Sequence, residues 1–254
     1  MKKIMMSALV ASSLAMAGGD IAPVEPMVET PVVEANPWKN EVTIYGWLPS
    51  ISASTPLPDS PNEIEASDIL DNLKMVFMGS YSGRNDTWSV FADYIYFKMG
   101  DSKTLTIPNV GDVHVGLDMD ATLIHAGAGY NLLDTGDGLL DLAVGVRYLD
   151  LGVEFRYDGV LINRTAEPSK DFTDFFVGVR GYKNINENWY IPYEADIGAG
   201  DTDLSWQVFA GVGYRYNWGD VKLGYRYLEF DMEDDAIVND LTIDGPVIGV
   251  SYKF

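Results

Sequence analysis

The last segment of the chain alternates between two kinds of side chain, and this alternation constrains the fold more than any other feature. From Ile248 to Phe254, apolar residues at even positions alternate with small or polar residues at odd positions. A period of two places one set of side chains on each face of a β-strand. The segment therefore predicts a strand with one apolar and one polar face.

Segments of the same kind recur from Trp38 onward. Several are near the ~9–11 residues that a strand needs to cross a membrane at a tilt. They predict ten strands, while eight or twelve stay compatible because the first and fifth segments are the least regular. The predicted strands cover 41–52, 72–83, 87–98, 117–132, 138–156, 171–183, 188–199, 203–217, 220–231 and 241–254.

The connections between these segments alternate in length, with the short loop at Gly200–Thr202 as the exception. Short turns on one rim and long loops on the other are typical of a transmembrane barrel. An even strand number puts both termini on the short-turn rim, and an unpaired strand edge cannot lie in hydrocarbon. The predicted fold class is all-β, a single closed antiparallel transmembrane β-barrel.

The amino-terminal residues predict export. Lys2 and Lys3 precede a short apolar run, and Ala15-Met16-Ala17 offers small residues to a signal peptidase. We therefore predict a signal peptide at 1–17, a Pro/Val/Glu-rich periplasmic linker at 18–37 and the barrel at 38–254. Removing the two lysines changes the formal charge from −21 to −23, which disfavours nucleic acid as a partner.

A glycine three residues before a tyrosine recurs in the predicted strands. An odd separation puts the two on opposite faces, so the tyrosine faces an outer aromatic girdle and the glycine faces the lumen. Gly178 and Tyr182 are four residues apart, which suggests a bulge. The regular copies are Gly127/Tyr130, Gly145/Tyr148, Gly211/Tyr214, Gly224/Tyr227 and Gly249/Tyr252.

These features resemble the small Gram-negative outer-membrane barrels of the opacity-protein and outer-membrane-protein-A type. The segment 68–100, with Trp88, Asp93 and Tyr96, also resembles uncharacterised proteobacterial barrel proteins. A final strand with Tyr252 and Phe254 resembles the terminal assembly signal of such proteins. The resemblance implies an outer-membrane location, with lipid, lipopolysaccharide and the barrel assembly machinery as partners.

Charged residues on the predicted inner face are the candidate site. On the lipid face Arg or Lys would cost ~2–4 kcal/mol at the membrane midplane, whereas in a lumen they can pair. They either fill a narrow lumen as a structural plug or line a narrow solute path. The predicted lumen network or pore lining is Lys74, Asp93, Arg147, Arg180, Glu194, Asp196, Arg215, Lys222, Arg226 and Lys253.

The long loops are acidic. Closely spaced carboxylates can hold calcium weakly, but the order of an EF-hand loop is absent, so solvated loops compatible with lipopolysaccharide are favoured. Acids of the first and last long loops are Asp59, Glu63, Glu65, Asp68, Asp71, Glu229, Asp231, Glu233, Asp234, Asp235 and Asp240.

No catalytic, cofactor or metal site is predicted. Asp112/His114 and Asp118/Asp120 resemble the Asp-x-His and Asp-x-Asp pairs of the omptin proteases, yet they lie within nine residues and cannot face each other across a barrel mouth. His125 is expected to pack against the wall or the lumen network. The sequence lacks cysteine and a P-loop.

The favoured function is a largely occluded barrel with a structural or surface-interaction role. A low-conductance channel for small solutes is the alternative, and a barrel hydrolase is third.

Overall fold

The structure is a computed structural model, and it describes residues 38–54, 63–107, 111–158, 163–166, 169–232 and 240–254. They belong to one compact unit, Asn36–Phe254. The predicted signal peptide and linker lie outside the described residues.

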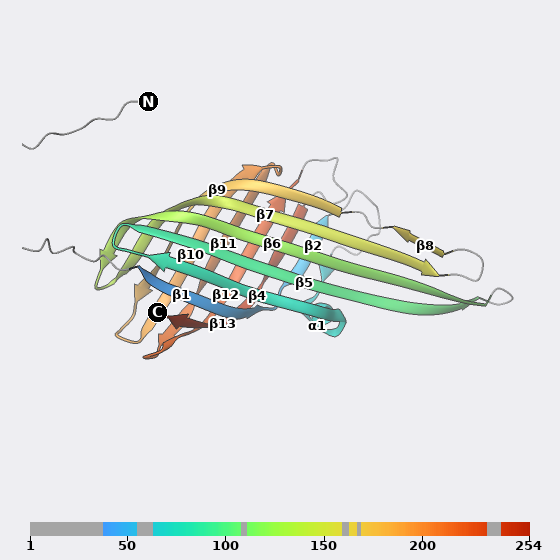
Figure 1. Cartoon of the computed structure of the whole chain (residues 1–254), viewed down its shortest axis with the longest axis horizontal. Helices are drawn as coiled ribbons and strands as arrows, with labels where there is room; N and C mark the ends of the chain where they lie inside the picture. Colours follow the sequence, from blue (N-terminus) through green and yellow to red (C-terminus); the bar gives the residue numbers. More distant parts are fainter. Residues whose placement is uncertain (1–37, 55–62, 108–110, 159–162, 167–168, 233–239) are drawn as a thin grey trace, which may run out of the picture. The chain divides into compact units, whose positions relative to one another are not determined.

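Ten antiparallel strands form a closed barrel, which confirms the predicted fold class and strand number (Figure 1). Each strand pairs with its neighbours in the chain, and β1 closes the barrel by pairing with β13. The barrel strands are β1 Lys39–Trp47, β4 Leu73–Arg84, β5 Trp88–Ile107, β6 Gly111–Thr135, β7 Gly138–Asp158, β9 Ser169–Asn184, β10 Trp189–Gly200, β11 Leu204–Arg215, β12 Gly219–Asp231 and β13 Asp240–Lys253.

Two regions differ from the predicted strand boundaries. The loop expected between Met99 and Gly116 is instead largely an extension of the β5–β6 hairpin, because the alternating pattern continues on both sides of its tip. The first strand is interrupted near Pro49, a residue that cannot donate a ladder hydrogen bond, and continues as β2, Ser50–Ser54. Three short elements complete the fold: β3 Glu63–Ile64, α1 Ala66–Asn72 and β8 Asn163–Ala166.

Short turns gather at one end of the barrel, and the strands β5, β6 and β7 extend furthest at the other end (Figure 1). Side-chain oxygens build two of these turns. Asn85 Oδ1 accepts hydrogen bonds from the backbone N–H groups of Thr87 and Trp88, and Asn186 Oδ1 accepts them from Asn188 and Trp189. Asparagine favours turns through such contacts, which explains why these connections are short.

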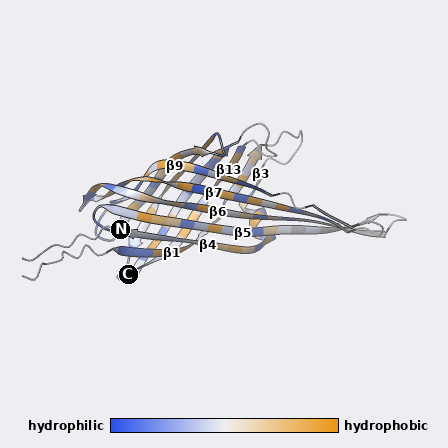
Figure 2. Cartoon of the chain, turned by 45° about the horizontal axis from the view of Figure 1, so that its top comes forward, coloured by the Kyte–Doolittle hydropathy of each residue, from blue (hydrophilic) through white to orange (hydrophobic). Residues whose placement is uncertain are grey.

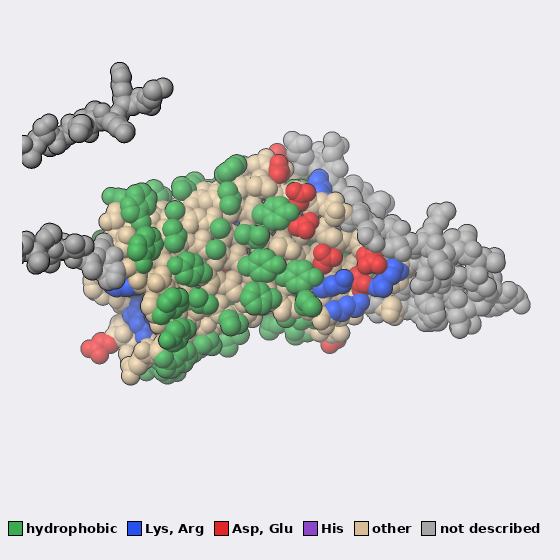
Figure 3. Space-filling view, viewed as in Figure 1, with side chains coloured by type: hydrophobic (Ala, Val, Ile, Leu, Met, Phe, Trp, Pro, Cys, Tyr) green, Lys and Arg blue, Asp and Glu red, His purple; other side chains and the backbone are tan. Residues whose placement is uncertain are grey.

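The outer wall carries a band of exposed apolar side chains between the two ends (Figure 2, Figure 3). On β13, Ile248, Val250 and Tyr252 are exposed, while Ser251 is fully buried. Aromatic pairs such as Trp88–Tyr130 and Trp189–Tyr214 lie beside the short turns, where an interfacial girdle is expected. No helix among the described residues is long and apolar enough to cross a membrane.

The lumen changes character along its length. On β12 the inward-facing residues run from Asp220 and Arg226 near the short turn to Leu228 and Phe230 near the long loops. The loop-side half is filled by an apolar cluster, which we call the loop-side plug. Its members are Trp47, Ile51, Ile69, Met78, Ile95, Met99, Leu123, Leu149, Phe172, Leu228, Phe230, Met232, Leu241 and Ile243.

The loop-side plug corrects the expectation of a polar lumen. Alternation assigns a face to each side chain but does not say whether the inner face at a given height is polar. Here the ring of inward positions beyond Arg147 is apolar, beginning with Leu149 on the same strand. The plug therefore adds a hydrophobic seal to the charged layer that the sequence predicts.

The suggested bulge at Gly178 and Tyr182 is absent, because β9 pairs with both neighbours without a register shift. A spacing of four simply keeps both residues on the inner face. Tyr182 therefore points into the lumen, where its ring contacts that of Tyr190.

Candidate functional site

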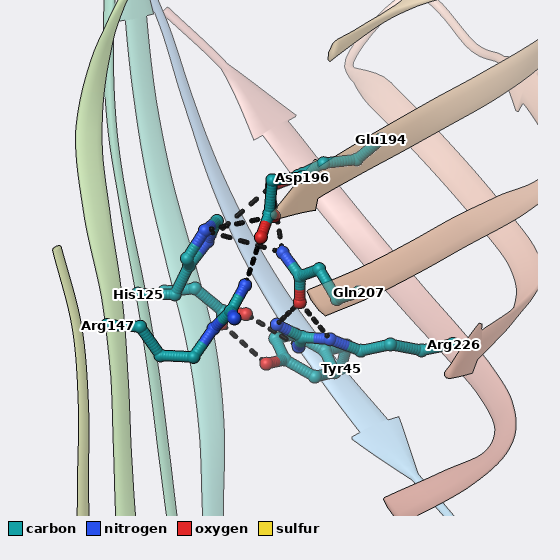
Figure 4. A network of polar contacts seen from close by, with 8 residues as sticks. Tyr45, His125, Arg147, Glu194, Asp196, Gln207 and Arg226 are labelled. Carbon is teal, nitrogen blue, oxygen red and sulfur yellow. Dashed lines mark hydrogen bonds and ion pairs between the residues drawn. The ribbon is translucent and has the colours of Figure 1, made fainter. Parts of the chain in front are cut away.

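A network of buried polar side chains crosses the lumen beneath the loop-side plug (Figure 4). It connects strands from opposite walls, because β1, β5, β6, β7, β10, β11 and β12 each contribute to it. We call it the central network, and its members are Tyr45, Asp93, His125, Arg147, Glu194, Asp196, Gln207 and Arg226.

Arg147 and Asp196 form the most buried ion pair of this network. Arg147 is 1% exposed, and one Nη donates to Asp196 Oδ1 while the other donates to Ser205 Oγ over 2.9 Å. Its guanidinium also lies over the rings of Phe176 and Phe230, at 5.7 and 5.8 Å. The pair therefore joins the central network to the loop-side plug through cation–π contacts.

Arg226 organises the other half of the central network. It donates to Asp93 Oδ2 over 2.8 Å and to Gln207 Oε1 over 2.9 and 3.2 Å. The Tyr45 hydroxyl donates to the second oxygen of Asp93 over 2.5 Å. Both carboxylate oxygens and the amide oxygen are therefore satisfied inside the barrel, as a buried polar network requires.

His125 lies between two carboxylates. Its Nδ1 is 3.5 Å from Glu194 and its Nε2 is 3.4 Å from Asp196, and its ring stacks on Phe176 at 4.3 Å. One ligand atom from each of the three polar residues falls within 4.8 Å of the others, a spacing that a metal ion could use. Arg147 already neutralises Asp196, however, and its positive charge opposes a cation there.

A cavity of about 680 Å³ lies between the central network and the short-turn end. A smaller one of about 140 Å³ continues from it to Arg226 and Asp93. We call the larger cavity the vestibule. Residues of the short-turn rim, such as Arg84, Asp134 and Asn184, line its mouth. In the part of the chain that the structure describes, the lumen is thus open at the short-turn end and filled at the other.

Most charges in the vestibule are paired. Lys222 donates to Glu41, and Lys253 donates to both oxygens of Asp220 over 2.7 Å. Tyr190 donates to the same Asp220 over 2.6 Å, and Arg84 pairs with Asp134 over 3.0 Å. Arg180 and Arg215 differ, because neither forms a salt bridge with a described carboxylate; their guanidinium groups lie over aromatic rings instead.

The structure divides the ten predicted site residues into three groups. The central network takes Asp93, Arg147, Glu194, Asp196 and Arg226, and the vestibule takes Arg180, Arg215, Lys222 and Lys253. Lys74 is separate. It is the extra residue of a bulge between Leu73 and Met75, so it reaches Asp118 on the outer wall rather than the lumen.

The Asp118 cluster lies at the loop-side rim, beyond Ile124, the last apolar residue on the outer face of β6. Lys74 and Arg156 both pair with Asp118, and the hydrogen bond from Lys74 is the main reason that the pKa of Asp118 is lowered. Burial opposes this shift but does not cancel it. Asp118 therefore stays ionised in the folded protein to a lower pH than an ordinary carboxyl group.

A pH dependence follows for the variant Asp118→Asn. A carboxyl with a lowered folded pKa stabilises the folded state above its unfolded pKa, near 3.8, and loses this contribution as pH falls through the folded value. We expect the wild type to be more stable than Asp118→Asn at neutral pH. The difference should shrink below pH 3.8 in urea unfolding followed by tryptophan fluorescence.

The control is Asp137→Asn, which removes an exposed pair with Lys183 at 3.6 Å. An exposed pair contributes little, so this variant should match the wild type at every pH. A difference between wild type and Asp118→Asn that stayed constant down to pH 2 would contradict the role of this carboxylate.

Several residues of the central network and the vestibule were not among the predicted site residues. Tyr45, Glu41 and Gln207 were missed, as was Asp220. They could have been identified from the alternation of faces along each strand, which puts them on the same face as the predicted lumen residues. Gln207 shares a face with Arg215 on β11, and Glu41 and Tyr45 share one on β1. His125 belongs to the central network, which agrees with the expectation that it packs against the polar network of the lumen rather than the wall.

The omptin-like acid pairs lie on one strand, since Asp112, His114, Asp118 and Asp120 all belong to β6. The side chains of Asp112 and His114 lie outside the part that the structure describes. Asp59, Glu233, Asp234 and Asp235 of the acidic loops and the side chain of Glu63 lie outside it as well, so the divalent-cation prediction stays a prediction.

Comparison with solved structures yields membrane barrels of several sizes. The chain aligns with the outer membrane protease OmpT from Escherichia coli at 11% identity and a TM-score of 0.45, over 87% of this chain and 98% of that one. It aligns with the translocator domain of the autotransporter NalP from Neisseria meningitidis at 13% identity and a TM-score of 0.44, over 87% of this chain and 90% of that one. It aligns with the attachment invasion locus protein Ail of Yersinia pestis at 11% identity and a TM-score of 0.36, over 85% of this chain and 98% of that one.

Neither a family model nor a curated protein sequence matches the chain. The assignment of the fold therefore rests on the chain's own geometry. Ten strands close through the β1–β13 pair, and apolar side chains cover the outer wall. This is the architecture of a small Gram-negative outer-membrane β-barrel.

Proposed function

We propose that this chain is an occluded outer-membrane barrel with a structural or surface-interaction role and no catalytic activity. The observation that carries the proposal is the filled lumen. The loop-side plug packs directly on the Arg147–Asp196 pair, through Phe230, so an apolar layer and a charged layer block the same path. A solute would have to displace both layers to cross.

The long hairpins support a role at the surface. β5, β6 and β7 contain 20, 25 and 21 residues, about twice the ~9–11 that a membrane crossing uses. Their outer parts extend beyond the apolar band, at the end opposite the short turns. We propose that the chain is exported through its amino-terminal signal, is inserted by the barrel assembly machinery, and presents these hairpins among lipopolysaccharide.

The test is conductance of the refolded protein in a planar lipid bilayer. We expect no reproducible unitary steps in molar KCl, because the lumen is filled over its loop-side half. Reproducible steps would overturn the occluded barrel and favour the low-conductance channel, which the vestibule supports because it opens half of the lumen. In that case Arg147→Ala or Arg180→Ala should change the ion selectivity.

A positive control is needed to interpret a bilayer recording that shows no conductance steps. The triple variant Arg147→Gly, Leu228→Gly and Phe230→Gly removes large side chains from both the charged layer and the loop-side plug. A folded triple variant that conducts would show that the measurement detects an opened lumen.

A further inference from the structure

Arg180 and Arg215 are the unusual groups of the vestibule. Each of the other charged side chains deep in this cavity has a polar partner, whereas these two guanidinium groups make no hydrogen bond and no salt bridge with the described residues. In Arg180 one Nη atom is buried and without any hydrogen-bond partner. Leaving a charged donor unsatisfied is costly, so an unpaired guanidinium needs a reason.

Aromatic rings hold both guanidinium groups in place. The Arg180 guanidinium carbon lies 3.8 Å from the centroid of Phe91. That of Arg215 lies 4.3 Å from Tyr190 and 5.0 Å from Tyr182. Tyr190 is itself fixed by its hydrogen bond to Asp220. These cation–π contacts limit the movement of the guanidinium groups without using their N–H donors in hydrogen bonds, which lowers the entropic cost of binding a ligand.

The cavity suits a small ligand. Its volume of about 680 Å³ falls within the ~300–1,000 Å³ of known small-molecule sites. Its lining combines three tyrosine rings with six basic and five acidic side chains. Each of the five carboxylates already has a polar partner, so none of them is left unpaired to repel an anion. Because the short-turn end of the barrel is open, a ligand can enter from that side, and the filled lumen beyond the central network keeps it from passing through.

We propose that the vestibule is a binding site for small multivalent anions that carry carboxylate or phosphate groups, with Arg180 and Arg215 as the binding residues. A guanidinium presents parallel N–H donors that match both kinds of anionic group. The chain as a whole is acidic, with a formal charge of −21, so two unpaired positive charges in one cavity are a local exception to its net charge. The proposal concerns binding at the short-turn end and is independent of whether the lumen conducts.

The experiment is isothermal titration calorimetry of the refolded protein in detergent, with citrate as the carboxylate probe and inorganic pyrophosphate as the phosphate probe. We expect saturable binding of at least one probe. The double variant Arg180→Gln with Arg215→Gln should lower the association constant at least about tenfold, since charge-assisted hydrogen bonds are lost. Binding of only one probe supports the proposal and identifies the anionic group.

Arg84→Gln is the matched control, because Arg84 lines the same cavity but is already paired with Asp134. It should change the association constant by less than about twofold, as expected for an exposed pair. Arg215→Lys keeps the positive charge but lacks the parallel N–H donors of a guanidinium, so it should bind the probe more weakly than the wild type does. Heat-modified migration on a gel verifies that each variant is folded. Absence of saturable binding to the wild type, or equal binding by the folded double variant, overturns the proposal.

Discussion

Replacing Arg147 by alanine is expected to lower the free energy of unfolding by about 3–5 kcal/mol, the cost of breaking a buried ion pair by removing one partner. The variant leaves Asp196 buried, and among the described residues only the His125 ring, at 3.4 Å, remains within salt-bridge distance. It also removes the cation–π contacts of the guanidinium with Phe176 and Phe230. Urea unfolding in detergent micelles, followed by tryptophan fluorescence, measures the effect.

A second variant separates the uncompensated charge from the loss of packing. Arg147→Met combined with Asp196→Asn removes both charges and keeps most of the volume, so it should recover a large part of the lost stability. Arg84→Ala breaks an exposed pair and should cost less than about 1 kcal/mol. The charged layer would not be a stabilising element if Arg147→Ala cost no more than Arg84→Ala.

Replacing Leu228 by alanine is expected to cost about 2–5 kcal/mol, because the change leaves a cavity in the loop-side plug. Leu228 is completely buried, between Arg226 and Phe230 on the inner face of β12. Its surroundings belong to a closed barrel whose strands are tied on both sides, so they can relax only partly into the space.

Leu223→Ala on the same strand is the matched control. Leu223 is 60% exposed on the outer wall, where lipid tails can fill the space that the deleted atoms leave. Its cost should therefore be clearly smaller than that of Leu228→Ala, in the same unfolding measurement. Equal costs would mean that the inner apolar cluster is loosely packed and contributes no more than the lipid-facing surface.

Strand number and lumen charges could be predicted from sequence because both depend on local rules. A period of two assigns faces, and asparagine-rich turns mark the short connections, so Arg147, Asp196 and Arg226 could be placed on the inner face without coordinates. The same rule, applied to every strand, also reaches Gln207 and Tyr45. The sequence therefore contained more of the central network than the charged residues alone.

Other features depend on contacts between distant segments. The loop-side plug forms because inward positions of nearly all strands reach the same height, and strand stagger decides which residues meet. Lys74 leaves the predicted set because one extra residue between Leu73 and Met75 reverses the parity locally. Whether a given arginine is paired also depends on cross-barrel distances, so no sequence pattern distinguishes Arg180 and Arg215 from Arg226.

The pairing of β1 with β13 has a consequence for biogenesis. Glu41 lies opposite Lys253, and the backbone groups of Asn40 and Phe254 exchange two hydrogen bonds, so the seam joins the first and the last strand of the barrel. Until the last strand exists, both β1 and β12 present unsatisfied edges that hydrocarbon does not tolerate. The barrel can therefore close only once β13 has been synthesised, and until then the two edges need another partner.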